Sequence, residues 1–157
     1  MIYSPTNKDY CISQGFGANP KMYKKYGLKG HNGQDLSVPI GTPIYAPIAG
    51  VVLIGNEGLN GFGKYVRVTE LVEGERKEIT LAHLSRILVK SGQIISEKIL
   101  IGYSGNTGNS TGPHLHWQLR RLDKNNIVKN YNNGFKGSEN IFSKSWILKH
   151  NNLISRY

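Results

Sequence analysis

Glycine recurs along the whole length of this chain. The 157 residues include 19 glycines, and many of them bound short runs rich in valine, isoleucine, leucine and tyrosine. Such runs, separated by glycine-containing turns, are typical of strands in an all-β domain. We therefore predict a mainly β fold with strands at residues 43–47, 50–55, 65–70, 77–84 and 114–120, and further short strands between 87 and 101. The charged link 73–76 favours an antiparallel hairpin.

The length suits one domain, since domains commonly hold about 100–150 residues. We assign residues 1–157 to a single domain. Its first 30 residues are expected to be an irregular lead-in with one short helix at residues 20–26, begun by Pro20 and ended by Gly27 or Gly30. Residues 121–157 are expected to form a C-terminal segment that closes the domain or is mobile. That segment holds a last apolar cluster of Phe142, Trp146 and Ile147.

Several classes of protein are excluded by composition. No apolar stretch approaches the ~20 residues that span a bilayer. The start lacks the basic and then apolar order of a secretory signal peptide, so none is expected in this chain. The single cysteine, Cys11, can form neither an internal disulfide nor a cysteine-rich zinc site, and we expect it to pack in or near the core. Any metal must therefore be bound by histidine and carboxylate.

Two histidine motifs lie among the predicted strands. His31 and Asp35 are four residues apart, and the glycines around them disfavour a helix, so a loop that enters a strand has to bring them together. His114 and His116 stand two apart on a predicted strand, so both point to one face while Leu115 and Trp117 point to the other.

His83 lies on another predicted strand, in register with Ile79 and Leu81. Taken singly, each histidine could be an ordinary polar residue with its hydrogen bonds satisfied, but their conjunction favours a metal site. Imidazole with one carboxylate suits Zn²⁺, which in catalytic sites keeps three protein ligands and an open position. The two remaining side chains suit a general base or acid and a stabiliser of an oxyanion.

The chain resembles the lysostaphin/LytM-like zinc endopeptidases, which cut peptides in bacterial peptidoglycan. The resemblance covers about residues 15–120 and rests on the motifs Gly15-Phe16-Gly17, His31-x-x-x-Asp35, Gly41-Thr42-Pro43-Ile44-Tyr45-Ala46, Ala82-His83-Leu84-Ser85 and Gly105-Asn106-Thr107-Gly108-Asn109-Ser110-Thr111-Gly112-Pro113-His114-Leu115-His116. It implies antiparallel β-sheets with an open groove that carries the metal site.

The same resemblance implies the site residues. His31, Asp35 and His116 would bind one Zn²⁺ per chain, and His83 and His114 would be the catalytic pair, with the choice of base left open. The implied reaction is hydrolysis of peptide bonds in peptidoglycan stems or cross-bridges by metal-activated water with histidine assistance. Small residues, glycine or alanine, would lie beside the metal.

Some features depart from the family pattern. Lys98 stands where the family usually has glycine, so we expect a local change of the loop there. An arginine often found after the Gly-Phe-Gly turn is missing, and Tyr23 and Tyr26 lie on the approach to His31, either at the mouth of the groove or packed as a short helix. The sequence around His31 resembles that of bacteriophage-borne members of the family. We therefore expect action at the bacterial cell wall, with delivery as a virion protein or lysin, or a chain that lacks its leader.

The formal net charge is +10, from 20 Lys and Arg against 10 Asp and Glu. Such a charge attracts nucleic acid, but the basic residues are scattered and no nucleic-acid-binding motif is present. Anionic cell-wall polymers account for the charge equally well, and a catalytically inactive wall-binding module is the other alternative. We expect a peptidoglycan peptide as partner, no nucleic acid, and a monomer. His150 is expected at the solvated surface.

Overall fold

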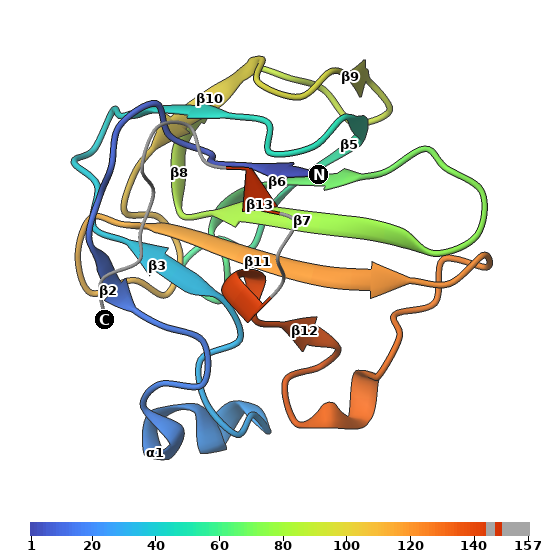
Figure 1. The fold of residues 1–157 in the computed structure, drawn as a ribbon. Coiled ribbons are helices and arrows are strands. Elements are labelled where there is room, and N and C mark those ends of the chain that lie inside the picture. The colour runs from blue at the N-terminus through green and yellow to red at the C-terminus, as the bar shows by residue number, and fades with distance from the viewer. Residues whose placement is uncertain (144–146, 149–157) are drawn as a thin grey trace.

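The computed structural model describes residues 1–143 and 147–148 (Figure 1). The largest sheet has strand order β2-β3-β11-β7-β6-β5-β9, with β12 beside β11, and all its neighbours pair antiparallel. Its strands are β2 (Ile12–Gln14), β3 (Gln34–Leu36), β5 (Gly50–Asn56), β6 (Lys64–Thr69), β7 (Arg76–Ala82), β9 (Ile94–Ile95), β11 (Leu115–Leu122) and β12 (Ser138–Glu139).

The remaining elements are smaller. A second antiparallel sheet has the order β4-β10-β8, and β1 pairs in parallel with β13. These strands are β4 (Pro43–Tyr45), β8 (Leu84–Ile87), β10 (Leu100–Ser104), β1 (Ile2–Tyr3) and β13 (Ile147–Leu148). The helices are α1 (Pro20–Tyr23) and the 3-10 turns η1 (Lys24–Tyr26), η2 (Tyr131–Asn133) and η3 (Ile141–Ser143). Among the described residues, none of these helices has the length and apolar character that spanning a bilayer requires.

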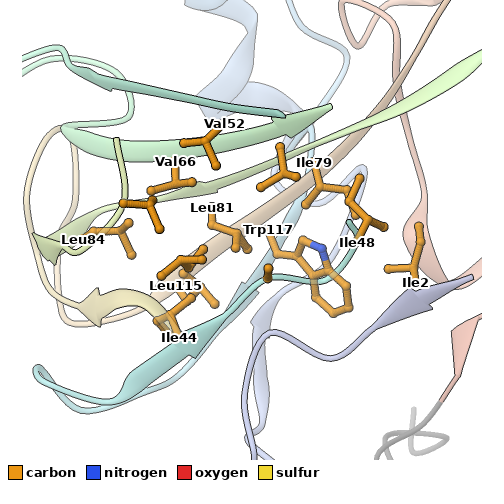
Figure 2. Close-up of a cluster of buried hydrophobic side chains, with 14 of the residues drawn as sticks. Ile2, Ile44, Ile48, Val52, Val66, Ile79, Leu81, Leu84, Leu115 and Trp117 are labelled. Carbon is orange, nitrogen blue, oxygen red and sulfur yellow. The ribbon is translucent and has the colours of Figure 1, made fainter. Parts of the chain in front are cut away.

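The hydrophobic core lies against one face of the large sheet (Figure 2). Alternate residues of its central strands point into the core and are fully or almost fully buried, among them Val66, Ile79, Leu81, Leu115 and Trp117. Residues of the second sheet and of the N-terminal segment belong to the same cluster, including Ile44, Leu84, Ile101 and Ile2. Because successive side chains of a strand alternate between faces, the intervening residues occupy the opposite face. We call this opposite face of β6, β7 and β11 the polar face; it carries Arg67, Glu78, Thr80, His116, Gln118 and Arg120.

The predicted mainly β architecture is confirmed, and so are the short helix, which ends at Gly27 in the left-handed conformation, and the hairpin of β6 and β7. The N-terminal lead-in is more regular than expected. It contributes β1 and β2 through cross-strand pairing with distant residues, and such pairing leaves little local signal in strands of two or three residues.

The strand predicted at residues 77–84 is interrupted, which corrects the prediction for His83. β7 ends at Ala82, and His83 has a φ of 62°, in the left-handed region. His83 is therefore not in register with Ile79 and Leu81, and the chain resumes as β8 in the second sheet.

Two further positions bear on the predictions. Cys11 is exposed, so the expectation that it packs in or near the core is wrong; Ile12 is the neighbour that packs against the core. Lys98 itself adopts the left-handed conformation, with a φ of 65°.

At the other end of the domain, Phe142 packs edge-on against Trp117 with 5.9 Å between ring centroids. Trp146 and His150 lie outside the described residues.

Candidate metal centre and histidine pair

Two paired strands bring Asp35 and His116 together. Asp35 is on β3 and His116 on β11, and the antiparallel register places the two residues directly opposite each other. Residues paired in this way have Cβ atoms about 4.5–5.5 Å apart. The sheet itself therefore joins two of the predicted ligands across 81 positions of sequence.

His31 reaches the same point from the loop before β3. Its backbone N–H donates to the Ala18 carbonyl at 2.9 Å, and its own carbonyl accepts from Gly17 N at 2.7 Å. Its ring Nδ1 lies 3.2 Å from the Gly15 carbonyl oxygen. Because a carbonyl can only accept, Nδ1 is the donor, and Nε2 of a neutral ring is left with its lone pair facing Asp35.

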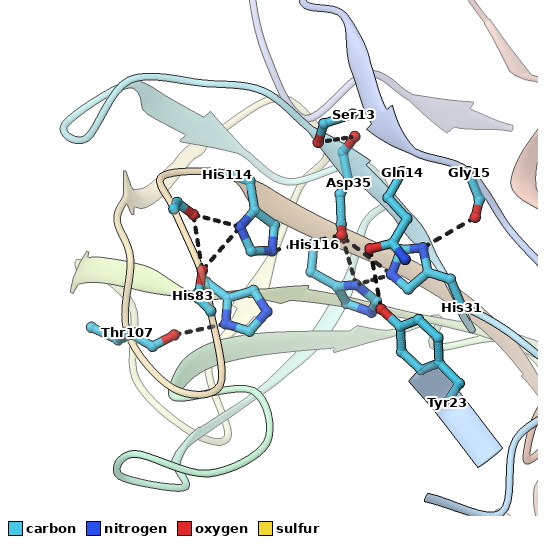
Figure 3. A network of polar contacts seen from close by, with 12 residues as sticks. Ser13, Gln14, Gly15, Tyr23, His31, Asp35, His83, Thr107, His114 and His116 are labelled. Atoms are coloured by element: carbon cyan, nitrogen blue, oxygen red, sulfur yellow. Dashed lines mark hydrogen bonds and ion pairs between the residues drawn. The ribbon is translucent and has the colours of Figure 1, made fainter. Parts of the chain in front are cut away.

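The three candidate ligand atoms form a small triangle (Figure 3). Asp35 Oδ1 lies 2.9 Å from His116 Nδ1 and 3.2 Å from His31 Nε2, and the two ring nitrogens are 3.0 Å apart. All three residues are buried. Ligands at about 2.0–2.1 Å from a tetrahedral zinc ion lie roughly 3.3 Å from one another. The donor set and its spacing therefore fit Zn²⁺.

The protonation states also suit metal binding. Burial alone would raise the pKa of Asp35, but the contacts of its carboxylate with His116 and then with His31 outweigh burial and hold its pKa below the ordinary value. Burial is the main cause that lowers the pKa of His116. An ionised Asp35 and a neutral His116, the forms that a metal ion requires, are thus favoured at neutral pH.

Gly33 makes room for the His116 ring. A Cβ atom on Gly33 would lie 2.5 Å from His116 Cε1 and 2.8 Å from the carbonyl oxygen of Trp117, closer than such atoms can approach. Nε2 of His116 is buried, and it finds no hydrogen-bond partner in the part of the chain that the structure describes. The ring is therefore held by packing and by its Nδ1 contacts.

His83 and His114 lie side by side next to this triangle, with 4.5 Å between ring centroids (Figure 3). His83 Nδ1 lies 2.7 Å from the Thr107 carbonyl oxygen, and His114 Nδ1 lies 2.8 Å from that of Gly112. Each Nδ1 is therefore a donor, and each Nε2 is left free to exchange a proton. His114 Nε2 is 3.8 Å from Asp35 Oδ2.

His83 is electrostatically distinct from an exposed histidine. Burial, and then the neighbouring His114 and His116 rings, lower its pKa to about 4. His83 is consequently neutral near pH 7. The His83 side chain points toward His114 because the backbone of His83 is in the left-handed conformation. The backbone N–H of His83 donates to the Phe62 carbonyl at 3.0 Å.

The loop 105–113, which leads to His114, is fastened to the loop between β5 and β6. Asn109 N donates to the Gly61 carbonyl at 3.0 Å, and Lys64 N donates to the Thr107 hydroxyl at 3.1 Å. Gly63 and Gly108 are in close backbone contact, because a Cβ on either would lie 2.3–2.4 Å from a backbone nitrogen of the other. The two loops therefore position the histidine pair as one unit.

Tyr23 borders the triangle on the α1 side. Its ring centroid is 5.4 Å from that of His31, and its hydroxyl donates to Gln14 Oε1 at 3.2 Å. Burial, and then the charge of Asp35, raise the pKa of Tyr23 to about 12. Tyr23 therefore stays a neutral phenol and packs against a candidate ligand, whereas Tyr26 is exposed and accepts a hydrogen bond from Asn109 Nδ2 at 2.6 Å.

Phe62 is the site residue that sequence reasoning missed. Its ring lies 5.3 Å from the His116 ring, and its carbonyl holds His83. The only signal was its place inside the glycine-rich segment 58–63, whose contact with the loop 105–113 depends on tertiary structure.

Comparisons with known proteins identify the family. The profile of Peptidase family M23 matches residues 29–130. The chain is 46% identical over 115 residues to the peptidoglycan DD-endopeptidase ShyA of Vibrio cholerae, a match that covers 73% of this chain and 26% of ShyA. This chain thus spans about a quarter of the length of the first curated relatives that it matches.

Solved structures show the same fold. The catalytic domain of lysostaphin from Staphylococcus simulans superposes with a TM-score of 0.64 at 29% identity, over 85% of this chain and 90% of that one. A zinc-containing peptidase from Vibrio cholerae superposes with a TM-score of 0.60 at 32% identity, over 80% of this chain and 37% of that one. With a family profile that spans well over half of its residues, this chain belongs to Peptidase family M23.

Proposed function

We propose that the chain is a zinc-dependent endopeptidase that hydrolyses peptide bonds in peptidoglycan stems or cross-bridges. The observation that carries the proposal is the convergence of His31 Nε2, Asp35 Oδ1 and His116 Nδ1 within 4.8 Å of one another, beside two further histidines. The name of the relative ShyA, a peptidoglycan DD-endopeptidase, supports the substrate class.

His31, Asp35 and His116 would hold the ion. When bound, Zn²⁺ polarises the scissile carbonyl and makes water nucleophilic near neutral pH. The single carboxylate among the ligands offsets part of the ionic charge, and burial of all three residues excludes competing water from the ligand side.

His83 and His114 would act as the catalytic pair. Each ring has its Nδ1 anchored by a backbone carbonyl, so each can take up or donate a proton only at Nε2. In the proposal one of them removes the proton of the attacking water, and the other donates a hydrogen bond to the oxygen that gains charge. Which ring has which role stays open in this proposal.

The proposed place of action is the bacterial cell wall, where the positive net charge would favour anionic wall polymers. Delivery by a bacteriophage and the monomeric state remain predictions. An inactive wall-binding module would not require five such side chains, and it is one outcome of the test below.

Digestion of purified peptidoglycan tests the proposal. The protein with zinc should release peptides whose masses identify the cleaved bond, a chelator should abolish release, and added zinc should restore it. Elemental analysis of the same sample should find about one zinc per chain. Binding to the wall without release would favour the inactive module, whereas release undiminished in chelator would contradict the metal mechanism. Salt-sensitive DNA binding without release would favour nucleic acid.

A further inference from the structure

The polar face continues past the metal triangle as ordered rows of side chains. The register pairs His116 with Ala82, then Gln118 with Thr80 and Arg67, and then Arg120 with Glu78 and Thr69. Successive residues on one face of a strand are about 7 Å apart, and neighbouring strands are about 4.8 Å apart. Arg67 is thus one row and two strands from His116.

Glu78 receives its shortest hydrogen bonds from Arg120 and not from Arg67. Its Oε1 accepts from Arg120 Nε at 3.0 Å and Nη2 at 2.5 Å, and its Oε2 lies 3.5 Å from the Thr69 hydroxyl. Arg67 comes no closer to Glu78 than 3.6 Å, through Nε. This Nε donates instead to the Thr80 hydroxyl at 3.2 Å.

Arg67 and Arg120 thus share the single carboxylate of Glu78, and Arg67 is the more weakly paired of the two. Its side chain is 19% exposed, and its guanidinium carbon lies 5.3 Å from the centroid of the Tyr65 ring. Within the described ranges, the two terminal amino groups of Arg67 have no acceptor on the protein. A rigid, planar guanidinium with both amino groups free is the arrangement that binds a carboxylate through two parallel hydrogen bonds.

We infer that Arg67 is a specificity-determining residue that binds a free carboxylate of the substrate peptide. This inference rests on the proposed function and names its substrate class: an extended peptide with an ionised carboxyl group within two to four residues of the cleaved bond. The estimate follows from the spacing of the rows, because an extended peptide advances about 3.4 Å per residue.

The test uses two soluble peptidoglycan dimers, one with free stem carboxylates and one with these groups converted to carboxamides. The zinc-loaded protein should cleave the carboxylate dimer with a kcat/KM about 10–100-fold higher, as a charge-assisted hydrogen bond predicts. Arg67→Gln should remove this preference by raising KM for the carboxylate dimer, with its kcat and the cleavage of the carboxamide dimer unchanged. Arg67→Lys, which retains charge but not the fork, should keep part of the preference.

Arg86→Gln is the matched control, because Arg86 is an exposed arginine on β8 of the second sheet and its loss removes the same charge. This variant should keep the full preference. An equal loss on both dimers in Arg67→Gln would show a structural role, and an unchanged preference would show that Arg67 does not contact the carboxylate; either result overturns the inference and leaves the peptidase proposal intact. Failure of the zinc-loaded wild type to cleave either dimer overturns both.

Discussion

The metal triangle and the histidine pair are neighbours, yet the chain builds them in different ways. Asp35 and His116 stand on regular paired strands, and their proximity follows from the β3–β11 register. His83 and His114 stand where strands are interrupted or begin, and backbone carbonyls of the loop 105–113 hold their rings. The sheet thus positions two of the three proposed ligands, whereas loops position the proposed catalytic pair.

His116→Ala should have the largest effect, because it removes a ligand from the sheet-built region. We expect zinc content to fall from about one per chain to near zero, and peptide release to fall to background. Elemental analysis and mass spectrometry of digested walls measure the two quantities. Zinc retained at the wild-type level would contradict the assignment of His116 as a ligand.

His114→Ala should separate the two regions. The triangle keeps its three ligand atoms, so zinc content should stay near the wild-type value, while kcat should fall about 10²–10⁴-fold with the loss of a proton-transfer group. Loss of zinc together with activity would break the distinction between sheet-built and loop-built regions.

Gly63→Ala tests whether the loops position the histidine pair. An added Cβ would lie 2.4 Å from Gly108 N, and φ at Gly63 is +56°, so the loop 105–113 should be displaced. We expect a lower kcat with zinc retained, and a loss of stability of about 1–3 kcal/mol in urea unfolding. Gly58→Ala is the matched control: its φ of +63° brings similar strain, but its Cβ would meet nothing within 4 Å. Equal kcat values in the two variants would show that the contact between Gly63 and Gly108 does not position the histidine pair.

Glu75→Gln should have the smallest effect, because Glu75 belongs to neither region. Hydrogen bonds from Lys129, and then from Arg121, lower its pKa from 4.5 to about 2. A lowered pKa contributes stability that is present above about pH 4.5 and is lost as the pH falls toward 2. The contribution of this ion pair to stability is small, since the side chains of Glu75 and Lys129 are exposed. Urea midpoints of the two proteins should therefore differ slightly at pH 7 and converge near pH 2, and at pH 7 the two proteins should have the same zinc content and kcat.

Most of the sheet can be predicted from the sequence, but the points at which its strands are interrupted cannot. Alternating apolar residues at Ile79, Leu81, Leu115 and Trp117 identify the buried face, because burial has the same period as the strand. The same rule fails at His83, where a left-handed residue changes the direction of the side chain without changing composition.

The candidate site shows the same limit. Motif spacing indicates His31, Asp35 and His116 as a group, and the structure brings them together. Phe62 and the carbonyl of Thr107 could not be predicted, because a backbone carbonyl has no sequence signature and the contact between the two glycine-rich loops is long-range. The sequence also does not distinguish which of the neighbours Cys11 and Ile12, at the start of the short edge strand β2, faces the core.

The pairing of β3 with β11 has a consequence for folding. Asp35 and His116 are 81 positions apart, so an ion shared between them would act as a removable cross-link between the first third of the chain and its last third. Because folding alone brings these ligands together, binding of the ion would stabilise the folded state relative to the unfolded polypeptide. The supply of metal would then regulate the stability of the whole domain as well as its chemistry. Metal-free chains would be the first to unfold and be degraded.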